Sequence, residues 1–218
     1  MKRIHSLTEA AQLLKSGGIL AHPADTCFGL AGDLMNPGVL KKIQQIKGRE
    51  ADKPMSIILQ AESGQRRAKS PIAKKSSTLT APRSPLKEYV VLSDYAEKVC
   101  EKLLPGAVTI VLPKGPKIPK WYFPETEWIG IRMVDDDNVN QLLNAFGGSL
   151  ITTSANLSGK PTCYTVEEVE KAFENAEVKP DGILVGKITD PKPPSTVIQV
   201  VEDRIEVLRE GPVKIEKD

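Results

Sequence analysis

A cluster of cations lies at the end of the helix predicted over residues 36–48. It consists of Lys47, Arg49 and Lys53. A guanidinium grips phosphate oxygens through a forked pair of hydrogen bonds and an ammonium acts as a point charge, so the cluster would suit a polyphosphate. The alternative is a solvated helix end, where cations interact favourably with the helix dipole. Taken alone, the cluster favours the solvated helix end.

Two more stretches place hydrogen-bonding side chains where a strand meets a loop. Ser154 and Asn156, followed by Ser158-Gly159, supply hydroxyls, an amide and a backbone that a ligand can approach closely. Asp25 and Thr26 offer a carboxylate and a hydroxyl beside small apolar residues, which could recognise the side chain of a small amino acid. For both stretches the alternative is an ordinary turn, because these residue types dominate turns for local reasons.

Several catalytic classes lack their signatures in this sequence. There is no GxxxxGK[ST], no GxGxxG and no GxSxG. The two histidines, His5 and His22, do not lie beside a nucleophile motif. A Ser-His-Asp hydrolase is therefore disfavoured.

The three cysteines, Cys27, Cys100 and Cys163, are far apart and form no CxxC pair. Neither a disulfide framework nor a zinc site is indicated, and reduced thiols are expected. Cys27 could act as a nucleophile near Asp25 and His22, but a small apolar core residue is the favoured interpretation.

The elements that would position these residues predict an α/β fold. Capping boxes at Ser6-Leu7-Thr8-Glu9 and Thr165-Val166-Glu167-Glu168 begin two helices. Other helices are expected over 36–48, 94–104 and 138–146, and strands over 19–21, 55–59, 108–112, 129–133 and 150–153. A hairpin is expected over 196–201 and 204–209, with Glu202-Asp203 as its turn. Because several strands follow one another without a helix, the sheet should be mixed.

The formal net charge of +2 is unevenly distributed. Residues 61–90 contain seven basic and two acidic residues, a local charge of +5, and the rest of the chain carries −3. Their Ser-Pro and Ala-Pro steps predict a basic inserted loop within a single domain of residues 1–218. The favoured interpretation is a solvated surface loop, and contact with tRNA phosphates is the alternative.

Hydropathy indicates a chain outside the membrane. No run of about 18 apolar residues is present, and the N-terminal residues lack an apolar signal core. We therefore expect a soluble cytoplasmic protein.

Taken in order, these stretches resemble the YrdC/Sua5 family of threonylcarbamoyl-AMP synthases. The family pattern is Pro-Thr-Asp/Glu-Thr-x-Tyr-Gly-Leu, KxR with a following Lys-Pro, Pro-Gly-x-x-Thr, an Ile-Arg strand, SxN with Ser-Gly, and a final Ser-Thr-Val and Arg-x-Gly. The matching residues are Asp25, Thr26, Gly29, Leu30, Lys47, Arg49, Lys53, Pro105, Gly106, Thr109, Arg132, Ser154, Asn156, Ser158, Gly159, Ser195, Thr196, Arg209 and Gly211. Apart from the basic insertion, the resemblance covers nearly the whole chain.

The resemblance implies a YrdC-like fold of the short form, a twisted open mixed sheet with flanking helices around a positively charged cavity. The implied activity is the synthesis of L-threonylcarbamoyladenylate and pyrophosphate from L-threonine, bicarbonate and ATP, for the threonylcarbamoyladenosine modification of tRNA. Mg²⁺ would be carried with ATP, and no metal site of the protein is implied. Downstream threonylcarbamoyl-transferase proteins would receive the product.

The resemblance also assigns roles by position. Lys47, Arg49, Ser154 and Asn156 would be catalytic. These four residues would bind ATP together with Lys53, Thr109 and Arg209. Threonine would be held by Thr26, Arg132, Thr152 and Thr196, because a guanidinium suits a carboxylate and hydroxyls suit polar atoms.

Two positions depart from the family pattern. Ala24 stands in place of threonine and Phe28 in place of tyrosine, which bears on selectivity for threonine more than on ATP binding. The main alternative function is a non-catalytic RNA-binding paralogue acting in ribosome or RNA maturation. Such paralogues tend to lose the KxR and SxN residues, and this chain keeps them. A hydrogenase maturation factor that uses carbamoyl phosphate shares the domain, but carries acylphosphatase and zinc-finger segments absent from this sequence.

Overall fold

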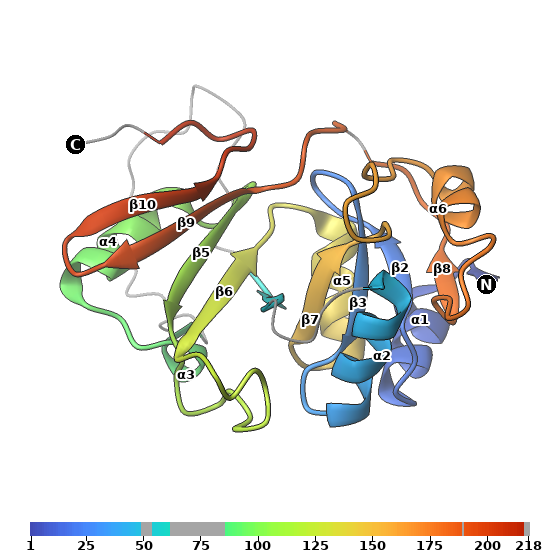
Figure 1. Ribbon diagram of the computed structural model, residues 1–218, viewed down its shortest axis with the longest axis horizontal. Helices are drawn as coiled ribbons and strands as arrows, with labels where there is room; N and C mark the ends of the chain where they lie inside the picture. The colour runs from blue at the N-terminus through green and yellow to red at the C-terminus, as the bar shows by residue number, and fades with distance from the viewer. Residues whose placement is uncertain (49–53, 62–85, 189, 216–218) are drawn as a thin grey trace.

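One mixed sheet of ten strands runs through the computed structural model (Figure 1). The structure describes residues 1–48, 54–61, 86–188 and 190–215. The strands are β1 (Lys2–Ile4), β2 (Leu20–Pro23), β3 (Phe28–Asp33), β4 (Ser56–Leu59), β5 (Val108–Pro113), β6 (Trp128–Met133), β7 (Leu150–Ser154), β8 (Gly182–Leu184), β9 (Thr196–Val201) and β10 (Arg204–Arg209). The helices are α1 (Leu7–Lys15), α2 (Pro37–Lys47), α3 (Leu86–Tyr89), α4 (Asp94–Leu103), α5 (Asp137–Phe146) and α6 (Val166–Ala172).

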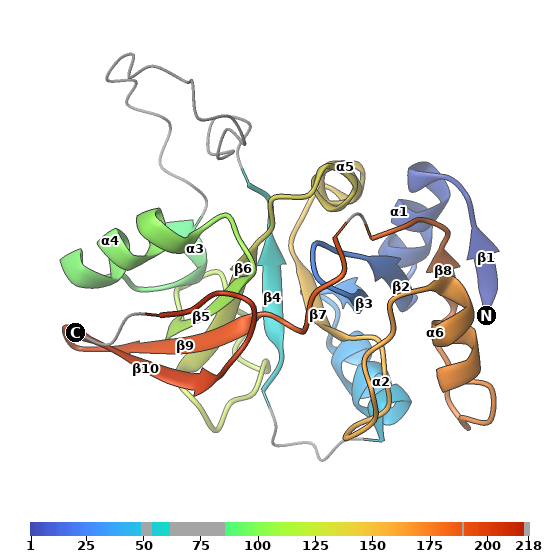
Figure 2. The same ribbon diagram turned by 90° about the horizontal axis from the view of Figure 1, so that it is seen from above.

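Strand β4 joins the two halves of the sheet. The strand order is β1-β8-β2-β3-β7-β4-β6-β5-β9-β10, in which β4 pairs antiparallel with β7 and parallel with β6. Figure 2 shows β4 at the centre of the molecule, with β5, β9 and β10 on one side and β2, β3 and β8 on the other. Parallel and antiparallel pairs both occur, which confirms the predicted mixed sheet.

Local capping signals fix the helix ends. The side chain of Ser6 accepts a hydrogen bond from the backbone N–H of Glu9, and Thr165 accepts one from Glu168, as the two capping boxes predict. Helix α2 ends at Gly48, whose φ of 55° lies in the left-handed region. Glycine adopts this conformation without strain, so the helix ends there and Lys47 becomes its last residue.

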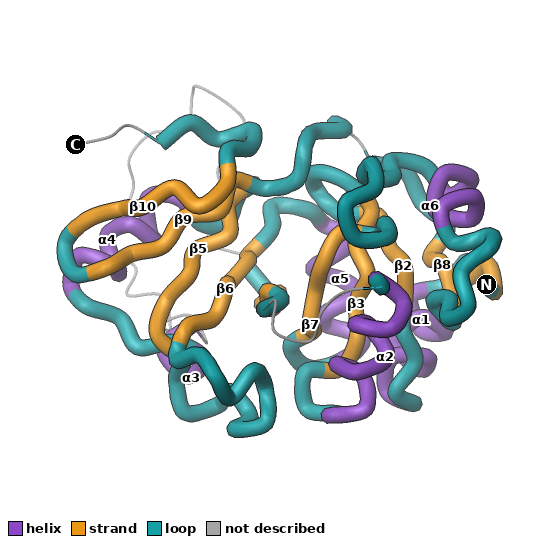
Figure 3. The backbone as a smooth tube through the Cα atoms, viewed as in Figure 1, coloured by secondary structure: helices purple, strands orange, loops and turns teal. Residues whose placement is uncertain are grey.

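The apolar side chains of the sheet alternate between its two faces. Ile57 and Ile151 join a core cluster that includes buried residues of α2, α4 and α6, whereas their neighbours Ile58 and Leu150 join a second cluster with α1 and α5. Figures 2 and 3 show α1 and α5 on one side of β2 and β3, and α2 and α6 on the other. Each fully buried leucine or isoleucine contributes roughly 1.5–3 kcal/mol to this packing.

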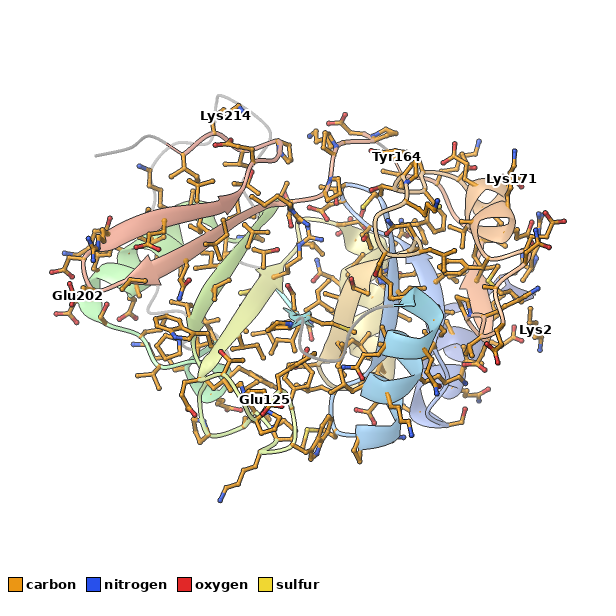
Figure 4. The ribbon with its side chains drawn as sticks, in the orientation of Figure 1. Lys2, Glu125, Tyr164, Lys171, Glu202 and Lys214 are labelled. Carbon is orange, nitrogen blue, oxygen red and sulfur yellow. The ribbon has the colours of Figure 1, made fainter. Side chains whose placement is uncertain are left out.

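The predicted terminal hairpin is confirmed with the predicted bounds, as β9 and β10. Its turn contains Glu202, a non-glycine residue with a φ of 53°. Figure 4 shows Glu202 at the outer tip of the hairpin, away from the centre of the sheet.

Strands β1, β3 and β8 were not predicted. The sequence of β3 contains two glycines, which weaken a strand pattern. At Gly32 a Cβ would lie 2.3 Å from Cγ1 of Val39 in α2. The glycine therefore lets α2 pack directly on the strand.

The C-terminal part of the predicted inserted loop is helical. Residues 86–89 form α3, and its side chains Leu86 and Tyr89 are buried. Residues 62–85 lie outside the described residues, so the conformation of the rest of the loop stays a prediction.

The three cysteines are free and buried, and their reduced state stays a prediction. Among the helices in the described part of the chain, none has the length and apolar character needed to cross a membrane. The cytoplasmic location stays a prediction.

His22 of β2 is an unusual buried polar group. It is 1% exposed, its Nδ1 lies 3.0 Å from the carbonyl oxygen of Pro23, and its Nε2 has no hydrogen-bond partner among the described residues. A carbonyl oxygen only accepts, so Nδ1 carries the proton and Nε2 carries the lone pair. Burial lowers the pKa of His22, which keeps the imidazole neutral.

We expect His22 to weaken the fold in acid. Its pKa is lower in the folded protein than the ordinary value of 6.5, so the unfolded chain binds the proton more readily and the free energy of unfolding falls as the pH drops below that value. The substitution His22→Leu should reduce this dependence in urea unfolding curves measured on both sides of that pH. The control His5→Leu, at an exposed position, should keep the wild-type dependence. An undiminished pH dependence in His22→Leu would contradict this account.

Candidate active site

A cavity of about 400 Å³ lies where the two halves of the sheet meet. This volume is within the range of small-molecule sites, roughly 300–1,000 Å³. The sequence-predicted site residues that line it are Thr26, Thr109, Arg132, Thr152, Ser154 and Arg209. They come from both halves of the sheet. The register of the strands brings them to one face, because Ser56 of β4 lies opposite both Thr152 of β7 and Gly130 of β6.

Gly130 keeps the middle of the cavity open. A Cβ at this position would lie 2.7 Å from Oγ of Ser56 and 3.0 Å from Cγ2 of Thr109. Both neighbours line the cavity. A larger residue at position 130 would therefore displace them and fill space that a ligand could use.

Lys47 connects the end of α2 to the end of β7. Although it is only 4% exposed, its Nζ donates hydrogen bonds to the carbonyl oxygen of Ser154 at 2.7 Å and to Oδ1 of Asn156 at 3.0 Å. The Nζ also lies 3.4 Å from Oγ of Ser154. A buried ammonium is stable only with such partners. The structure thus brings together three of the four residues predicted to be catalytic.

The loop after β7 is fixed against the end of α2. The backbone N–H of Ser158 donates to the carbonyl oxygen of Lys47 at 2.9 Å, and Nδ2 of Asn156 donates to the carbonyl oxygen of Lys160. Lys47 and Asn156 do not themselves line the cavity but contact Ser154, which does. The predicted ATP-binding residues Arg49 and Lys53 lie outside the described residues.

Arg132 of β6 is paired with Asp25. Its Nη2 donates to both carboxylate oxygens, at 2.8 and 3.1 Å, and the two side chains are 11% and 13% exposed. The Nε of Arg132 is buried and has no partner in the described part of the chain. Because a guanidinium carries several N–H donors, Arg132 keeps donors besides Nη2.

A second polar group is formed by Thr109, Ser195 and Arg209. The hydroxyls of Thr109 and Ser195 are 2.8 Å apart, and Nη2 of Arg209 donates to the carbonyl oxygen of Ser195 at 2.8 Å. Burial lowers the pKa of Arg209, and the positive charge of Arg132 lowers it further. Because Asp25 offsets the charge of Arg132, the positive character of the cavity stays a prediction.

The predicted threonine-binding residues do not all reach the cavity. Thr26 and Thr152 are buried in its wall. Thr196 is fully buried, and its Oγ1 donates to the carbonyl oxygen of Val213 at 2.7 Å. Its neighbours on either side, Ser195 and Val197, line the cavity instead, since side chains alternate along a strand. Thr196 is thus not among the cavity-lining residues.

Further cavity residues were not singled out from the sequence. Ser56, Thr126 and Trp128 line the cavity. A usable signal existed at Ser56, the one polar residue in a strand that otherwise reads Ile-Ile-Leu. Trp128 carried no such signal, because an apolar residue at the start of a strand is ordinary.

Cys27 also lines the cavity and is 6% exposed. Burial raises the pKa of its thiol, so the thiol stays protonated. A protonated thiol is a poor nucleophile, which supports the interpretation of Cys27 as a small apolar wall residue.

The chain matches a known protein family over most of its length. Residues 12–211 match the Sua5/YciO/YrdC family model, whose description is "Telomere recombination". A candidate threonylcarbamoyl-AMP synthase of Methanocaldococcus jannaschii is 32% identical over 203 residues, 93% of this chain and 84% of the relative. The threonylcarbamoyl-AMP synthase of Vibrio campbellii is 28% identical, with 97% of this chain and 100% of the relative covered.

Solved structures share the fold. A structure of Sua5 from P. abyssi has a TM-score of 0.77 at 25% identity and covers 96% of this chain. This chain spans little more than half of that protein, 56%. The structure of YciO from E. coli, at 21% identity, has a TM-score of 0.75 and covers 96% of this chain and 94% of its own. The ten-stranded sheet, the residues that meet in its cavity and the family match over residues 12–211 together show that this chain belongs to the Sua5/YciO/YrdC family.

Proposed function

We propose that the protein is a nucleotidyltransferase that makes threonylcarbamoyl-AMP and pyrophosphate from L-threonine, bicarbonate and ATP. The observation that carries this proposal is that Arg132, Ser154 and Arg209 line the same cavity. Lys47 donates a hydrogen bond to the carbonyl oxygen of Ser154. The family relatives named threonylcarbamoyl-AMP synthases support it. The product serves the threonylcarbamoyladenosine modification of tRNA.

Threonine binds through its carboxylate to Arg132. The guanidinium lines the cavity and is oriented by Asp25, so its remaining N–H donors can hold a second carboxylate. Thr26 and Thr152 lie in the same wall and offer hydroxyls to the amine or the side chain of the substrate. A Sua5 structure from P. abyssi is complexed with L-threonine, which supports a threonine site in this fold.

ATP binds with its phosphates towards Lys47, Ser154 and Asn156. The Lys47 ammonium is fixed by two oxygen acceptors before any ligand arrives, so its charge is placed without a further loss of side-chain entropy. Arg49 and Lys53 add cations from the same segment of the sequence. Thr109 and Arg209 contact the nucleotide from the opposite half of the sheet.

The reaction has two bond-forming steps. The threonine amine attacks the carbon of bicarbonate, and loss of water gives a carbamate. A carbamate oxygen then attacks the α-phosphorus of ATP, the bond to the β-phosphate oxygen breaks, and pyrophosphate leaves. The protein contributes by holding the reactants in contact and by stabilising charge on the phosphates.

Other components of the reaction follow from its chemistry. Mg²⁺ is carried with ATP and supplies charge neutralisation at the phosphates. Threonylcarbamoyl-transferase proteins use the product.

The purified protein should form threonylcarbamoyl-AMP from threonine, bicarbonate and Mg-ATP. Mass spectrometry should detect the adenylate, and pyrophosphate should appear in equal amount. Omission of threonine or bicarbonate should abolish both signals. Pyrophosphate release that does not depend on threonine would contradict the proposed function.

Lys47→Met should weaken ATP binding while the chain stays folded. A lost charge-assisted hydrogen bond contributes roughly 1.5–3 kcal/mol, which corresponds to an increase of about tenfold or more in the Kd for ATP. Isothermal titration calorimetry measures this change. Lys41→Met is the matched control, because Lys41 is exposed on the same helix and should leave the Kd unchanged. An equal Kd for ATP in both variants would show that Lys47 has only a structural role.

Arg132→Lys should impair the use of threonine. Lysine keeps the charge but loses the forked donor geometry, so we expect the KM for threonine to rise about tenfold while the Kd for ATP changes little. Steady-state kinetics with threonine varied gives the KM, and calorimetry gives the Kd. The control Arg204→Lys, at an exposed position of β10, should leave both constants unchanged. If ATP affinity falls and the threonine KM does not rise, Arg132 does not bind the amino acid.

A further inference from the structure

The imidazole of His22 lies beside the cavity wall. Its strand, β2, pairs with β3 in a register that sets His22 opposite Gly29, and Gly29 lines the cavity. Figure 1 shows β2, β3 and β7 side by side in one half of the sheet. The side chain of His22 is 1% exposed, and its Nε2 has no hydrogen-bond partner among the described residues. A buried acceptor without a partner destabilises the fold, which points to a role outside core packing.

Gly29 leaves a gap between this imidazole and a hydroxyl of the cavity wall. A Cβ at position 29 would lie 3.3 Å from Nε2 of His22 and 3.5 Å from Oγ1 of Thr152. The two atoms therefore flank the same small space, and a side chain at position 29 would separate them. Thr152 of β7 lines the cavity, whereas His22 does not. The hydroxyl is thus placed to act between the imidazole and a ligand.

The imidazole can only accept a hydrogen bond at Nε2. Its Nδ1 donates to the carbonyl oxygen of Pro23 at 3.0 Å, which leaves the lone pair on Nε2. Burial lowers the pKa of His22 and keeps the ring neutral. The hydroxyl of Thr152 is a donor whose proton rotates about the C–O bond. Once that proton points towards Nε2, the hydroxyl oxygen offers only lone pairs to the cavity.

We propose that His22 is a positioning residue that makes the Thr152 hydroxyl an acceptor for the ammonium group of the amino-acid substrate. This inference rests on the proposed function, because the substrate is the same L-threonine. An ammonium group carries three donors and no acceptor, so it needs oxygen lone pairs around it. When it donates to Thr152, the hydroxyl proton turns towards Nε2, and the two hydrogen bonds strengthen each other. A carboxylate at the same place would meet no donor, so the arrangement fixes which end of the amino acid lies at Thr152.

Steady-state kinetics with threonine varied tests this role. His22→Phe keeps a ring in the buried space but removes the lone pair at Nε2. We expect the KM for threonine to rise about fivefold, the effect of one neutral hydrogen bond, while the Kd for ATP measured by calorimetry stays unchanged. His22→Gln, whose side-chain oxygen can accept at the place of Nε2, should recover most of the loss. The control His5→Phe, at an exposed position, should behave as the wild type does.

A double-mutant cycle identifies the residue through which His22 acts. Thr152→Val removes the hydroxyl and should itself raise the KM for threonine. In this background His22→Phe should cause no further rise, because the donor to Nε2 is already lost, whereas two independent residues would give effects on the KM that multiply. A thermal unfolding curve shows that each variant is folded. His22→Leu, which also lacks the lone pair, takes the place of His22→Phe if the phenylalanine variant does not fold.

The outcomes are distinct. If the wild type forms threonylcarbamoyl-AMP but His22→Phe leaves the KM for threonine unchanged, only this inference is overturned. If His22→Phe changes the KM for threonine and the Kd for ATP by the same factor, the effect is structural and the inference is again overturned. Effects of the two single variants that multiply in the double variant would also overturn it. If the wild type forms no adenylate, the proposed function fails and the inference with it.

Discussion

The pairing of β4 with β7 on one side and β6 on the other is the constraint on which the site depends. These backbone ladders are the only direct connection between the two halves of the sheet among the described strands. They also set the register, so Ser56 faces the cavity together with Thr152 and Gly130. A shift of one residue would turn Ser56 towards the core and Ile57 towards the ligand. The apolar neighbours in β4, buried in clusters on both faces, oppose such a shift.

The two halves of the sheet contribute different chemistry to the cavity. The β7 side carries hydroxyls and, through Ser154, the buried ammonium of Lys47. The β5, β6, β9 and β10 side carries the arginines together with apolar surface. ATP also has two unlike ends, a charged phosphate chain and a flat base, and a small amino acid must lie near the α-phosphate. A cavity with hydrogen-bonding and charged groups on both walls can hold such reactants in contact, which supports catalysis by proximity.

Local signals in the sequence predicted much of the fold, and tertiary packing explains the rest. The capping boxes and Gly48 define helix ends because their interactions span only a few residues. Strand β3 was not predicted, because a glycine such as Gly32 weakens a strand pattern. Its role is to let α2 pack closely on the strand, and this contact between separate elements is not visible in the local sequence. In the site, Lys47, Ser154 and Asn156 were predicted to act together, and the structure brings them into contact. The hairpin bounds were also predictable, but which face Thr196 occupies depends on the register with β5, and the structure places Ser195 at the cavity instead.

The central claim is that ATP and threonine meet in the cavity between the two halves of the sheet, which β4 joins. The most direct measurement is a crystal structure of the protein with L-threonine and a non-hydrolysable ATP analogue. The account predicts the threonine carboxylate at Arg132, the phosphates beside Ser154 and Lys47, and the amine between them within reach of the α-phosphate. A structure with either ligand bound elsewhere, or with the phosphates away from Lys47, would contradict it.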